Sequence, residues 1–476
     1  MKPLTLQQVS QRVGGELWGP PAGTVTGVTT DSRKVAPGDL FVALRGERFD
    51  GHRYLNDAFA GGAVAALGER SRLDDRPPDR PVVAVNDSRA ALGRLAAACR
   101  RDFELPVVAV AGSNGKTTVK ELLAAVLRER AETLASPASY NNDVGVPLTL
   151  LALRPRHRAA VVEAGTNHPG ELAALLEWIR PDHGVLTSIG AEHLEFFGDL
   201  AGVAREESAL AAALPAGGGL FVNGDAPALE LACAPTAATV TRVGWSAGCA
   251  WRITAAVIDL AGTTFTLRAP RAEFSGEYFL PLLGRHQVVN AALAVAAAAA
   301  LGVTPDEARR GLAAVRPAPM RLEPVTLAGR VVLNDAYNAN ADSVIAALET
   351  LADVAGGRRT VAVLGPMAEL GARAAGEHAR VGRAAGGCGI DRLVAVGPET
   401  APLSEAARRA GVPAVDECPD AAAAAALLAR TLTPADLTLV KASRAACFER
   451  LVADLRAAWA AAPPTANPGT PTCCTT

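Results

Sequence analysis

The chain has no marked excess of charge of one sign and no long apolar run. Its 476 residues carry 47 basic and 49 acidic side chains, so composition gives no reason to expect nucleic acid or an anionic membrane as a partner. No uninterrupted apolar segment approaches the roughly 18 residues that a membrane helix needs, and the N-terminal segment lacks the apolar core of a signal peptide. We therefore expect small-molecule substrates, a cytoplasmic location and no stable membrane insertion.

Clustered cysteines are also missing. The eight cysteines are scattered apart from the pair Cys473 and Cys474, and they show no zinc-ligand spacing. Free thiols in a reducing compartment are the simplest interpretation. The last third of the chain has no GxGxxG dinucleotide fingerprint either, so the sequence predicts neither a zinc site nor a nicotinamide site.

Pattern changes along the chain predict three α/β domains and a tail. Residues 1–85 have short, turn-rich strands, residues 86–316 alternate strands with helices, and residues 317–461 repeat that alternation. Residues 462–476 are rich in Pro, Thr and Gly and are predicted to be disordered. Strands are predicted at 25–28, 40–44, 63–66, 105–110, 159–163, 184–188, 331–333, 360–364, 393–396 and 437–440, and an inserted antiparallel hairpin at 251–260 and 263–267.

The segment from 112 to 118 has the features of a phosphate-binding loop. It lies between a β-branched run, 105–110, and a helical apolar pattern that begins at Val119. Glycines allow close approach to phosphate oxygens, Lys116 supplies charge to the outer phosphates, and the Thr117 hydroxyl can join the shell of a magnesium ion. The predicted nucleotide-binding residues of this loop are Gly112, Ser113, Asn114, Gly115, Lys116, Thr117 and Thr118.

This loop departs from the strict pattern, because Val110 stands where a first glycine is expected. Considered without the rest of the chain, the loop is interpreted as a shortened phosphate-binding loop that binds ATP. The alternative is an ordinary polar helix start with Ser113 as its capping residue.

Two further polar residues follow predicted parallel strands. Glu163 ends the strand at 159–163, and His193 follows the strand at 184–188. In parallel sheets ligands bind outside the carboxyl ends of the strands, so these side chains and Thr117 could hold magnesium against the phosphates of ATP. The alternative for either residue alone is a capping or solvated role.

Several segments together resemble the Mur ligases, ATP-dependent amide-bond-forming enzymes of bacterial cell-wall synthesis. The resemblance runs in the same order along nearly the whole chain, from 30–33 to 441–444. It is carried by TDSR (30–33), GSNGKTT (112–118), YNNDVGVPLT (140–149), GAEHLEFFG (190–198), GRHQVVN (284–290) and KASR (441–444). It implies a small N-terminal α/β substrate domain, a central P-loop ATPase domain with a parallel sheet, and a C-terminal Rossmann-like domain.

Within that family, the C-terminal segments 335–343 (DAYNANADS) and 364–371 (LGPMAELG) are most similar to the member that adds D-alanyl-D-alanine to UDP-N-acetylmuramoyl-tripeptide. Tyr337, Asn338 and Asn340 would contact the dipeptide, because amides both donate and accept hydrogen bonds. Turn residues at a strand end are the alternative for Asn338 and Asn340. Pro366 and Ala341 depart from the family's usual aspartate and proline.

The resemblance also implies roles for single residues. Lys116 would neutralise the transferring phosphoryl group, and Glu163 with His193 would hold magnesium. Further contacts to ATP would come from Asn290 to adenine, Arg321 to phosphate and Asp335 to ribose. The residues implied around the UDP-sugar and peptide are Thr30, Asp31, Ser32, Arg33, Gly46, Asp50, His52, Asn141 and Asn142.

The implied chemistry needs no protein nucleophile. A substrate carboxylate attacks the γ-phosphorus of ATP to give an acyl phosphate, and the amine of the dipeptide then displaces phosphate. The protein's task is positioning and charge neutralisation. We expect a monomer.

One position departs from the family in a way that affects the metal site. Mur ligases usually carry a lysine that carbon dioxide converts to a carbamate, and here that position falls on Glu207. Glu207 would supply the negative oxygens permanently, although its carboxylate ends roughly 3–4 Å nearer the backbone. A bridging water or a shifted helix must close that gap. The alternative is a solvent-facing helix glutamate and a site with one metal.

Two other functions remain to be compared. Folylpolyglutamate synthetases share the ATP domain and the acyl-phosphate route, but lack the TDSR-type domain and the DAYNAN run. A catalytically retired homologue that binds a nucleotide-sugar as a regulator would explain the lost lysine. Retention of Lys116, Thr117 and Glu163 argues against it.

Overall fold

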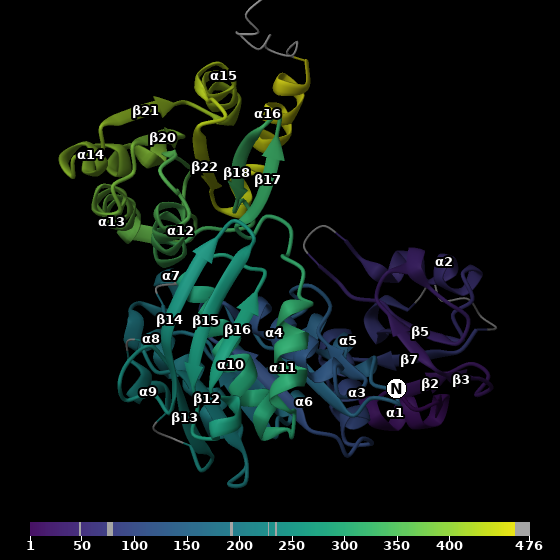
Figure 1. Cartoon of the computed structure of the whole chain (residues 1–476). Helices are drawn as coiled ribbons and strands as arrows, with labels where there is room; N and C mark the ends of the chain where they lie inside the picture. Colours follow the sequence, from purple (N-terminus) through teal and green to yellow (C-terminus); the bar gives the residue numbers. More distant parts are fainter. Residues whose placement is uncertain (47–48, 74–79, 191–193, 227, 234–235, 462–476) are drawn as a thin grey trace, which may run out of the picture. The chain divides into compact units, whose positions relative to one another are not determined.

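The computed structural model describes residues 1–46, 49–73, 80–190, 194–226, 228–233 and 236–461 (Figure 1). The predicted disordered segment 462–476 and the predicted magnesium ligand His193 lie outside the described residues. The chain forms two compact units. Unit 1 contains Met1–Val257, Ala261–Pro281 and Arg285–Arg316, and unit 2 contains Ile258–Leu260, Leu282–Gly284 and the chain from Pro317 onward.

The N-terminal part of unit 1 is built on a five-stranded sheet in the order β2-β7-β6-β5-β4. Its strands are β2 (Glu16–Trp18), β4 (Gly27–Thr29), β5 (Asp39–Val42), β6 (Ala65–Glu69) and β7 (Val82–Val85), with helices α1 (Leu6–Val13) and α2 (Leu55–Ala60). A separate antiparallel pair joins β1 (Leu4–Thr5) to β3 (Thr24–Val25). The predicted strand at 25–28 is therefore two strands, β3 and β4, in different sheets.

Alternation of side chains along these strands gives the small sheet two apolar faces. Leu40 and Val42 belong to the large core of unit 1 with residues of α1 and of α3 (Ser88–Arg100). Phe41 and Ala43 belong to a separate core with Leu55 and other residues of α2. Because the first face shares one core with the central part of unit 1, the units do not divide at the predicted boundary after residue 85. That boundary stays a prediction.

The central sheet of unit 1 has nine strands in the order β16-β15-β14-β13-β12-β11-β8-β10-β9. Their bounds are β8 (Val107–Ala111), β9 (Thr133–Ala135), β10 (Ala159–Glu163), β11 (His183–Leu186), β12 (Gly219–Asn223), β13 (Thr239–Gly244), β14 (Trp251–Asp259), β15 (Gly262–Arg268) and β16 (Gly276–Leu280). The pairs from β9 to β14 are parallel, which agrees with the parallel sheet predicted from the strands that form β8, β10 and β11. The predicted hairpin is not an insertion, since β14 and β15 continue this same sheet and β16 extends it further (Figure 1).

Helices cover both faces of this sheet. The bounds are α4 (Lys116–Arg128), α5 (Gly145–Leu151), α6 (Glu171–Ile179), α7 (Leu194–Phe197), α8 (Leu200–Ala213), α9 (Leu229–Cys233), α10 (Arg285–Ala300) and α11 (Pro305–Ala313). Helices α3, α6 and α8 pack with Val107 and Ala109 in one core, while α4 contacts α10 and α11. The alanine run 296–300 is part of α10 and mostly buried. Across the described residues, no helix has the length and apolar character to cross a membrane.

Unit 2 has a six-stranded sheet in the order β17-β18-β22-β19-β20-β21. Its strands are β17 (Glu323–Leu327), β18 (Arg330–Asn334), β19 (Arg359–Leu364), β20 (Arg392–Val396), β21 (Ala414–Cys418) and β22 (Asp436–Lys441), and its helices are α12 (Ala341–Asp353), α13 (Ala374–Gly387), α14 (Ala401–Arg409), α15 (Ala421–Thr431) and α16 (Glu449–Ala461). Leu333 packs in a core with α12, α13 and α14, and the neighbouring Val332 packs in a core with α15 and α16. Strict alternation thus gives a doubly covered α/β sheet.

Candidate functional site

Four adjacent parallel strands in unit 1 end in, or are followed by, polar residues or the phosphate loop at one edge of the sheet. The neighbours in order are β11, β8, β10 and β9. Ser188 follows β11, Gly112 follows β8, Glu163 ends β10 and Ser136 follows β9. Carboxyl ends of parallel strands are where α/β sheets bind ligands, so this edge is the candidate site.

The loop after β8 requires glycine at both ends. Gly112 has φ +115° and Gly115 has φ +91°, backbone conformations that L side chains rarely adopt. A Cβ at Gly112 would lie 2.5 Å from Thr187 Oγ1, and a Cβ at Gly115 would lie 2.6 Å from Asn290 Oδ1. The fold thus brings Asn290 of α10 against the loop, although its predicted contact with adenine stays a prediction.

Part of the loop is fastened to the segment after β11. The Ser113 N–H donates to Ser188 O at 3.0 Å, and the Asn114 N–H donates to Ser188 Oγ at 2.8 Å. These two N–H groups therefore hold the loop's shape and are not available to a phosphate in this structure. The N–H groups of Thr117 and Thr118, in the first turn of α4, have no acceptor within the helix and could donate to a ligand.

Ser113 is not a helix cap. Its Oγ accepts a hydrogen bond from the Gly190 N–H at 2.8 Å, whereas the N-cap position of α4 is Gly115. The alternative of a polar helix start capped by Ser113 is therefore wrong. Lys116 at the first helical position folds back over the loop, where Nζ donates to Gly112 O at 2.5 Å and to Ser113 O at 3.0 Å.

Thr117 and Glu163, predicted as magnesium ligands, are in direct contact. Thr117 Oγ1 donates to Glu163 Oε1 at 3.1 Å, and Asn141 Nδ2 donates to the same oxygen at 3.0 Å. Gly165 makes room for Asn141, because a Cβ there would lie 2.7 Å from Asn141 Nδ2. Asn141, expected among the substrate residues, thus belongs to the Glu163 cluster.

The second oxygen of Glu163 remains available for a ligand. Glu163 is 1% exposed, and its Oε2 accepts no hydrogen bond from any described residue. No group of three or more His, Cys, Asp and Glu suited to a metal occurs among the described residues. Mg²⁺ in nucleotide sites commonly takes one or two protein oxygens and completes its shell with phosphates and waters. Thr117 and Glu163 are hard oxygen donors that fit this requirement.

Lys120 is a charged residue of this site that the sequence analysis missed. Its side chain is fully buried, and Nζ donates to Ser136 O at 2.8 Å and to Ala138 O at 2.6 Å. Nζ also lies 3.8 Å from Glu163 Oε2. The signal was present, because Lys120 is three residues after Thr117 and so shares its helix face.

Two neighbouring glutamates of α8 have different environments. Glu207 is 2% exposed, so the alternative of a solvent-facing glutamate is wrong. Glu206, which the sequence analysis passed over, accepts hydrogen bonds from the N–H groups of Gly170 at 2.7 Å and Leu172 at 2.9 Å, and from Thr166 Oγ1 at 3.1 Å. Its carboxylate therefore sits at the N-terminus of α6, where negative charge is favourable.

The predicted UDP-sugar residues fall into two small motifs of the N-terminal part. Asp31 accepts from the Arg33 guanidinium at 2.9 Å, which lowers the pKa of Asp31 to about 2, and Thr30 and Ser32 beside it are half-buried. His52 is buried, with Nδ1 2.7 Å from Asp50 Oδ1 and Nε2 accepting from the Glu69 N–H at 2.8 Å. Both ring nitrogens thus serve the protein itself.

Two other predicted substrate residues also have local backbone partners. The Gly46 N–H donates to Phe49 O at 2.8 Å. Asn142 Oδ1 accepts from the Gly145 N–H at 2.9 Å, at the start of α5. Their contacts to a substrate stay predictions.

The predicted residues of unit 2 surround a buried ion pair. Asp335 Oδ2 lies 2.7 Å from Lys441 Nζ, and Oδ1 accepts from the Leu322 N–H at 3.1 Å. Burial raises the pKa of Asp335. Lys441 Nζ also donates to Asn338 O at 2.8 Å, which fixes the segment after β18.

The other four residues predicted in unit 2 have distinct surroundings. The Arg321 guanidinium lies 4.2 Å from the centre of the Tyr337 ring. Asn338 is exposed. Asn340 Oδ1 accepts from the Ser343 N–H at 2.9 Å as the N-cap of α12, which is the turn-type role considered as its alternative.

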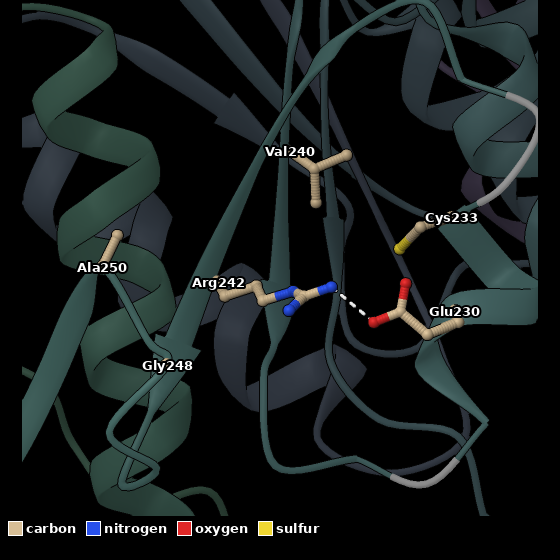
Figure 2. Close-up of a pocket in the computed structure, with 6 residues that line it drawn as sticks. All are labelled: Glu230, Cys233, Val240, Arg242, Gly248 and Ala250. Atoms are coloured by element: carbon tan, nitrogen blue, oxygen red, sulfur yellow. Dashed lines mark hydrogen bonds and ion pairs between the residues drawn. The ribbon is translucent and has the colours of Figure 1, made fainter.

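A pocket elsewhere in unit 1 has no predicted role. It has a volume of about 490 Å³, and its lining consists of Glu230, Cys233, Val240, Arg242, Gly248 and Ala250 (Figure 2). These six residues include no predicted site residue. Arg242 forms an ion pair with Glu230, and burial raises the pKa of Cys233 to about 11, so this thiol is protonated and unreactive near neutral pH.

Comparisons with known proteins agree with the resemblance seen in the sequence. The Mur ligase middle domain matches residues 110–298, the glutamate ligase domain of Mur ligases matches 320–444, and the Mur ligase family catalytic domain matches 24–100. The chain is 42% identical to the UDP-N-acetylmuramoyl-tripeptide–D-alanyl-D-alanine ligase of Escherichia coli, over 85% of this chain and 88% of that protein.

Solved structures extend the similarity over nearly the whole chain. MurF from Acinetobacter baumannii has a TM-score of 0.87 at 32% identity, covering 96% of this chain and 99% of that one. MurF ligase from Thermotoga maritima, solved in complex with ADP, has a TM-score of 0.81 at 26% identity, covering 91% and 98%. With the phosphate loop, the Thr117–Glu163 contact and this coverage together, the chain belongs to the Mur ligase family.

Proposed function

We propose that this chain is an ATP-dependent ligase that joins D-alanyl-D-alanine to UDP-N-acetylmuramoyl-tripeptide in peptidoglycan synthesis. Relatives with that activity in their names match most of the chain at 33% identity or more. The single structural observation that supports catalysis is the contact of Thr117 with the buried Glu163 beside an intact phosphate loop.

The first step is transfer of the γ-phosphoryl group to a substrate carboxylate. A carboxylate is a poor acyl donor, so its oxygen attacks the γ-phosphorus and ADP leaves. Lys116 and the first-turn N–H groups of α4 lie where they can balance the negative charge of the phosphates. To do so, the Lys116 ammonium exchanges its two loop carbonyls for phosphate oxygens.

Magnesium would be held by Thr117 and Glu163, with the predicted ligands His193 and Glu207, and it would neutralise negative charge on the phosphates. Asn141 orients Glu163 by donating to Oε1, which leaves Oε2 for the ion. We assign to Glu207 the negative charge that a carbamoylated lysine gives other family members. Its burial on α8 supports that assignment.

The second step forms the amide bond. The amine of the dipeptide attacks the acyl phosphate, a tetrahedral intermediate forms, and phosphate leaves. Asn290, Arg321 and Asp335 remain our predicted contacts for ATP, and Tyr337, Asn338 and Asn340 those for the dipeptide. Cytoplasmic location and the monomeric state also remain predictions from the sequence.

Phosphate release with different acceptors tests the function. Purified protein is incubated with ATP, Mg²⁺ and UDP-N-acetylmuramoyl-tripeptide, and receives D-alanyl-D-alanine, single D-alanine, or tetrahydrofolate with glutamate in place of the muramyl substrate. Release with the dipeptide alone is the expected result, and Lys116→Met is the inactive control. Release with tetrahydrofolate and glutamate would favour the folylpolyglutamate synthetase alternative. Binding of the nucleotide-sugar without any release would favour a retired homologue.

A further inference from the structure

Lys120 is a fully buried lysine whose ammonium lies within the candidate site. Its Nζ donates to Ser136 O and Ala138 O, and lies 3.8 Å from Glu163 Oε2. It also forms an ion pair at 2.8 Å with Glu121, whose side chain is 43% exposed. Burying an ammonium is costly, so a fold that needed only to fill this space would use an apolar side chain. We propose that Lys120 is a positioning residue that shapes the magnesium site.

The segment that Lys120 holds is strained at one residue. Ala138 has φ +44°, in the left-handed region that costs a residue with a side chain about 1–2 kcal/mol. The Ala138 carbonyl receives the shorter of the two Lys120 hydrogen bonds, at 2.6 Å. A charged donor to a carbonyl makes a strong hydrogen bond. Lys120 thus stabilises a turn that the backbone alone disfavours.

This turn delivers two side chains to the Thr117–Glu163 pair. Ser139, the next residue, places Oγ 3.4 Å from Thr117 Oγ1. Asn141, two residues further, donates to Glu163 Oε1. Before the turn, Ser136 Oγ accepts from the Glu163 N–H at 3.0 Å. One ammonium therefore fixes the segment 136–141 against β10 and α4, and through it the orientation of Glu163.

The inference rests on the proposed function, because it assumes a nucleotide with magnesium at this site. If Lys120 only stabilised the fold, its loss would weaken nucleotide binding equally with and without magnesium. If it orients Glu163 and Thr117, the loss falls on the magnesium-dependent part of binding. Nucleotide affinities measured with and without magnesium therefore distinguish a structural role of Lys120 from a positioning role, and the measurement does not depend on turnover.

The test compares ADP binding with Mg²⁺ and with EDTA by calorimetry in the full-length chain. Lys120→Met should weaken binding of Mg²⁺-ADP by about tenfold or more and binding of ADP in EDTA by less than about threefold. Arg128→Met is the matched control, because Arg128 is exposed at the other end of the same helix, and it should change neither affinity.

Two substitutions at Ala138 test the turn itself. Ala138→Gly in the Lys120→Met background should recover part of the lost affinity, since glycine adopts this conformation without strain. Ala138→Val keeps Lys120, and because Ala138 is exposed, the larger side chain does not disturb the core. This variant should reproduce the magnesium-selective loss of affinity even if Lys120→Met does not fold. Native-like Mg²⁺-ADP affinity in Lys120→Met, or equal losses in both conditions, would overturn the inference. If the native chain itself bound no Mg²⁺-ADP, the proposed function would fail first.

Discussion

Both units contain a buried carboxylate beside a buried lysine, but the two pairs are built differently. In unit 2, Asp335 and Lys441 are in direct contact at 2.7 Å. In unit 1, Lys120 Nζ donates its hydrogen bonds to two carbonyl oxygens and lies 3.8 Å from Glu163 Oε2. This oxygen receives no hydrogen bond from the described residues. The first arrangement satisfies the carboxylate within the protein. Among the residues that the structure describes, the second leaves Glu163 Oε2 with only a longer ion pair to Lys120, and this is the oxygen that we propose binds magnesium.

The sharpest way to break this comparison is to remove the charge of Glu163. Glu163→Gln keeps the shape of the side chain. Because we propose that Glu163 holds the magnesium that neutralises charge on the transferring phosphoryl group, the substitution should lower turnover by about a thousandfold. Steady-state phosphate release measures the loss, and thermal unfolding shows whether the variant is folded. A decrease below tenfold would mean that Glu163 is not a ligand.

The same change in unit 2 should act on stability. Asp335→Asn leaves the Lys441 charge buried without its partner, which should cost about 3 kcal/mol in the free energy of unfolding. Urea denaturation measures this cost. The control is Glu405→Gln, which breaks the exposed Arg409–Glu405 pair and should cost less than about 0.5 kcal/mol. Equal losses in the free energy of unfolding for Asp335→Asn and Glu405→Gln would mean that the buried Asp335–Lys441 pair is no more important for stability than the exposed pair.

Glu207 extends the comparison to a third buried carboxylate. Glu207→Gln should lower turnover by about tenfold and raise the Mg²⁺ concentration needed for half-maximal rate, because one negative ligand is lost. Arg205→Gln, at an exposed position of the same helix, is the control. The native rate should not change when carbon dioxide is removed. Unchanged magnesium dependence in Glu207→Gln would contradict the assignment.

The smallest effect concerns a half-buried carboxylate of the N-terminal part, Asp31. The Arg33 hydrogen bonds lower the pKa of Asp31 from 3.8 to about 2. A depressed pKa in the folded state adds stability above the unfolded value, and this contribution is lost as pH falls from about 4 to about 2. Carboxyl NMR titration of native protein and of Arg33→Gln checks it. In the variant the Asp31 midpoint should move back toward 3.8.

The sequence predicted the parts of this site that follow from local pattern. Thr117 and Glu163 were found because one lies in a loop motif and the other ends a β-branched strand. Lys120 was missed because a lysine in an amphipathic helix is usually solvated, and its burial depends on the 136–141 turn. Ser188 was missed because its role is to bond the loop across the sheet edge.

Strand prediction missed, among others, two buried apolar strands, β7 and β12, and two strands that have no clear apolar run. β13 (TVTRVG) is largely exposed or half-buried, and β17 carries a proline, so neither has the apolar run of β8. They are strands because neighbouring strands pair with them. The strands of the hairpin, β14 and β15, were predicted close to their observed bounds, but their place in the central sheet and the next strand, β16, were not predicted.

The bond network of Glu206 limits how the neighbouring Glu207 can reach a metal. Glu206 fastens α8 to α6 through Gly170, Leu172 and Thr166, so sliding α8 along its axis would break three hydrogen bonds or drag α6 with it. The Glu207 side chain is shorter than the carbamoylated lysine that it would replace. Because α8 is bonded to α6, a shift of the α8 backbone would not easily make up this difference in length. If Glu207 serves a magnesium ion, as we propose, a water between its carboxylate and the ion would close the remaining distance at lower cost than moving the helix.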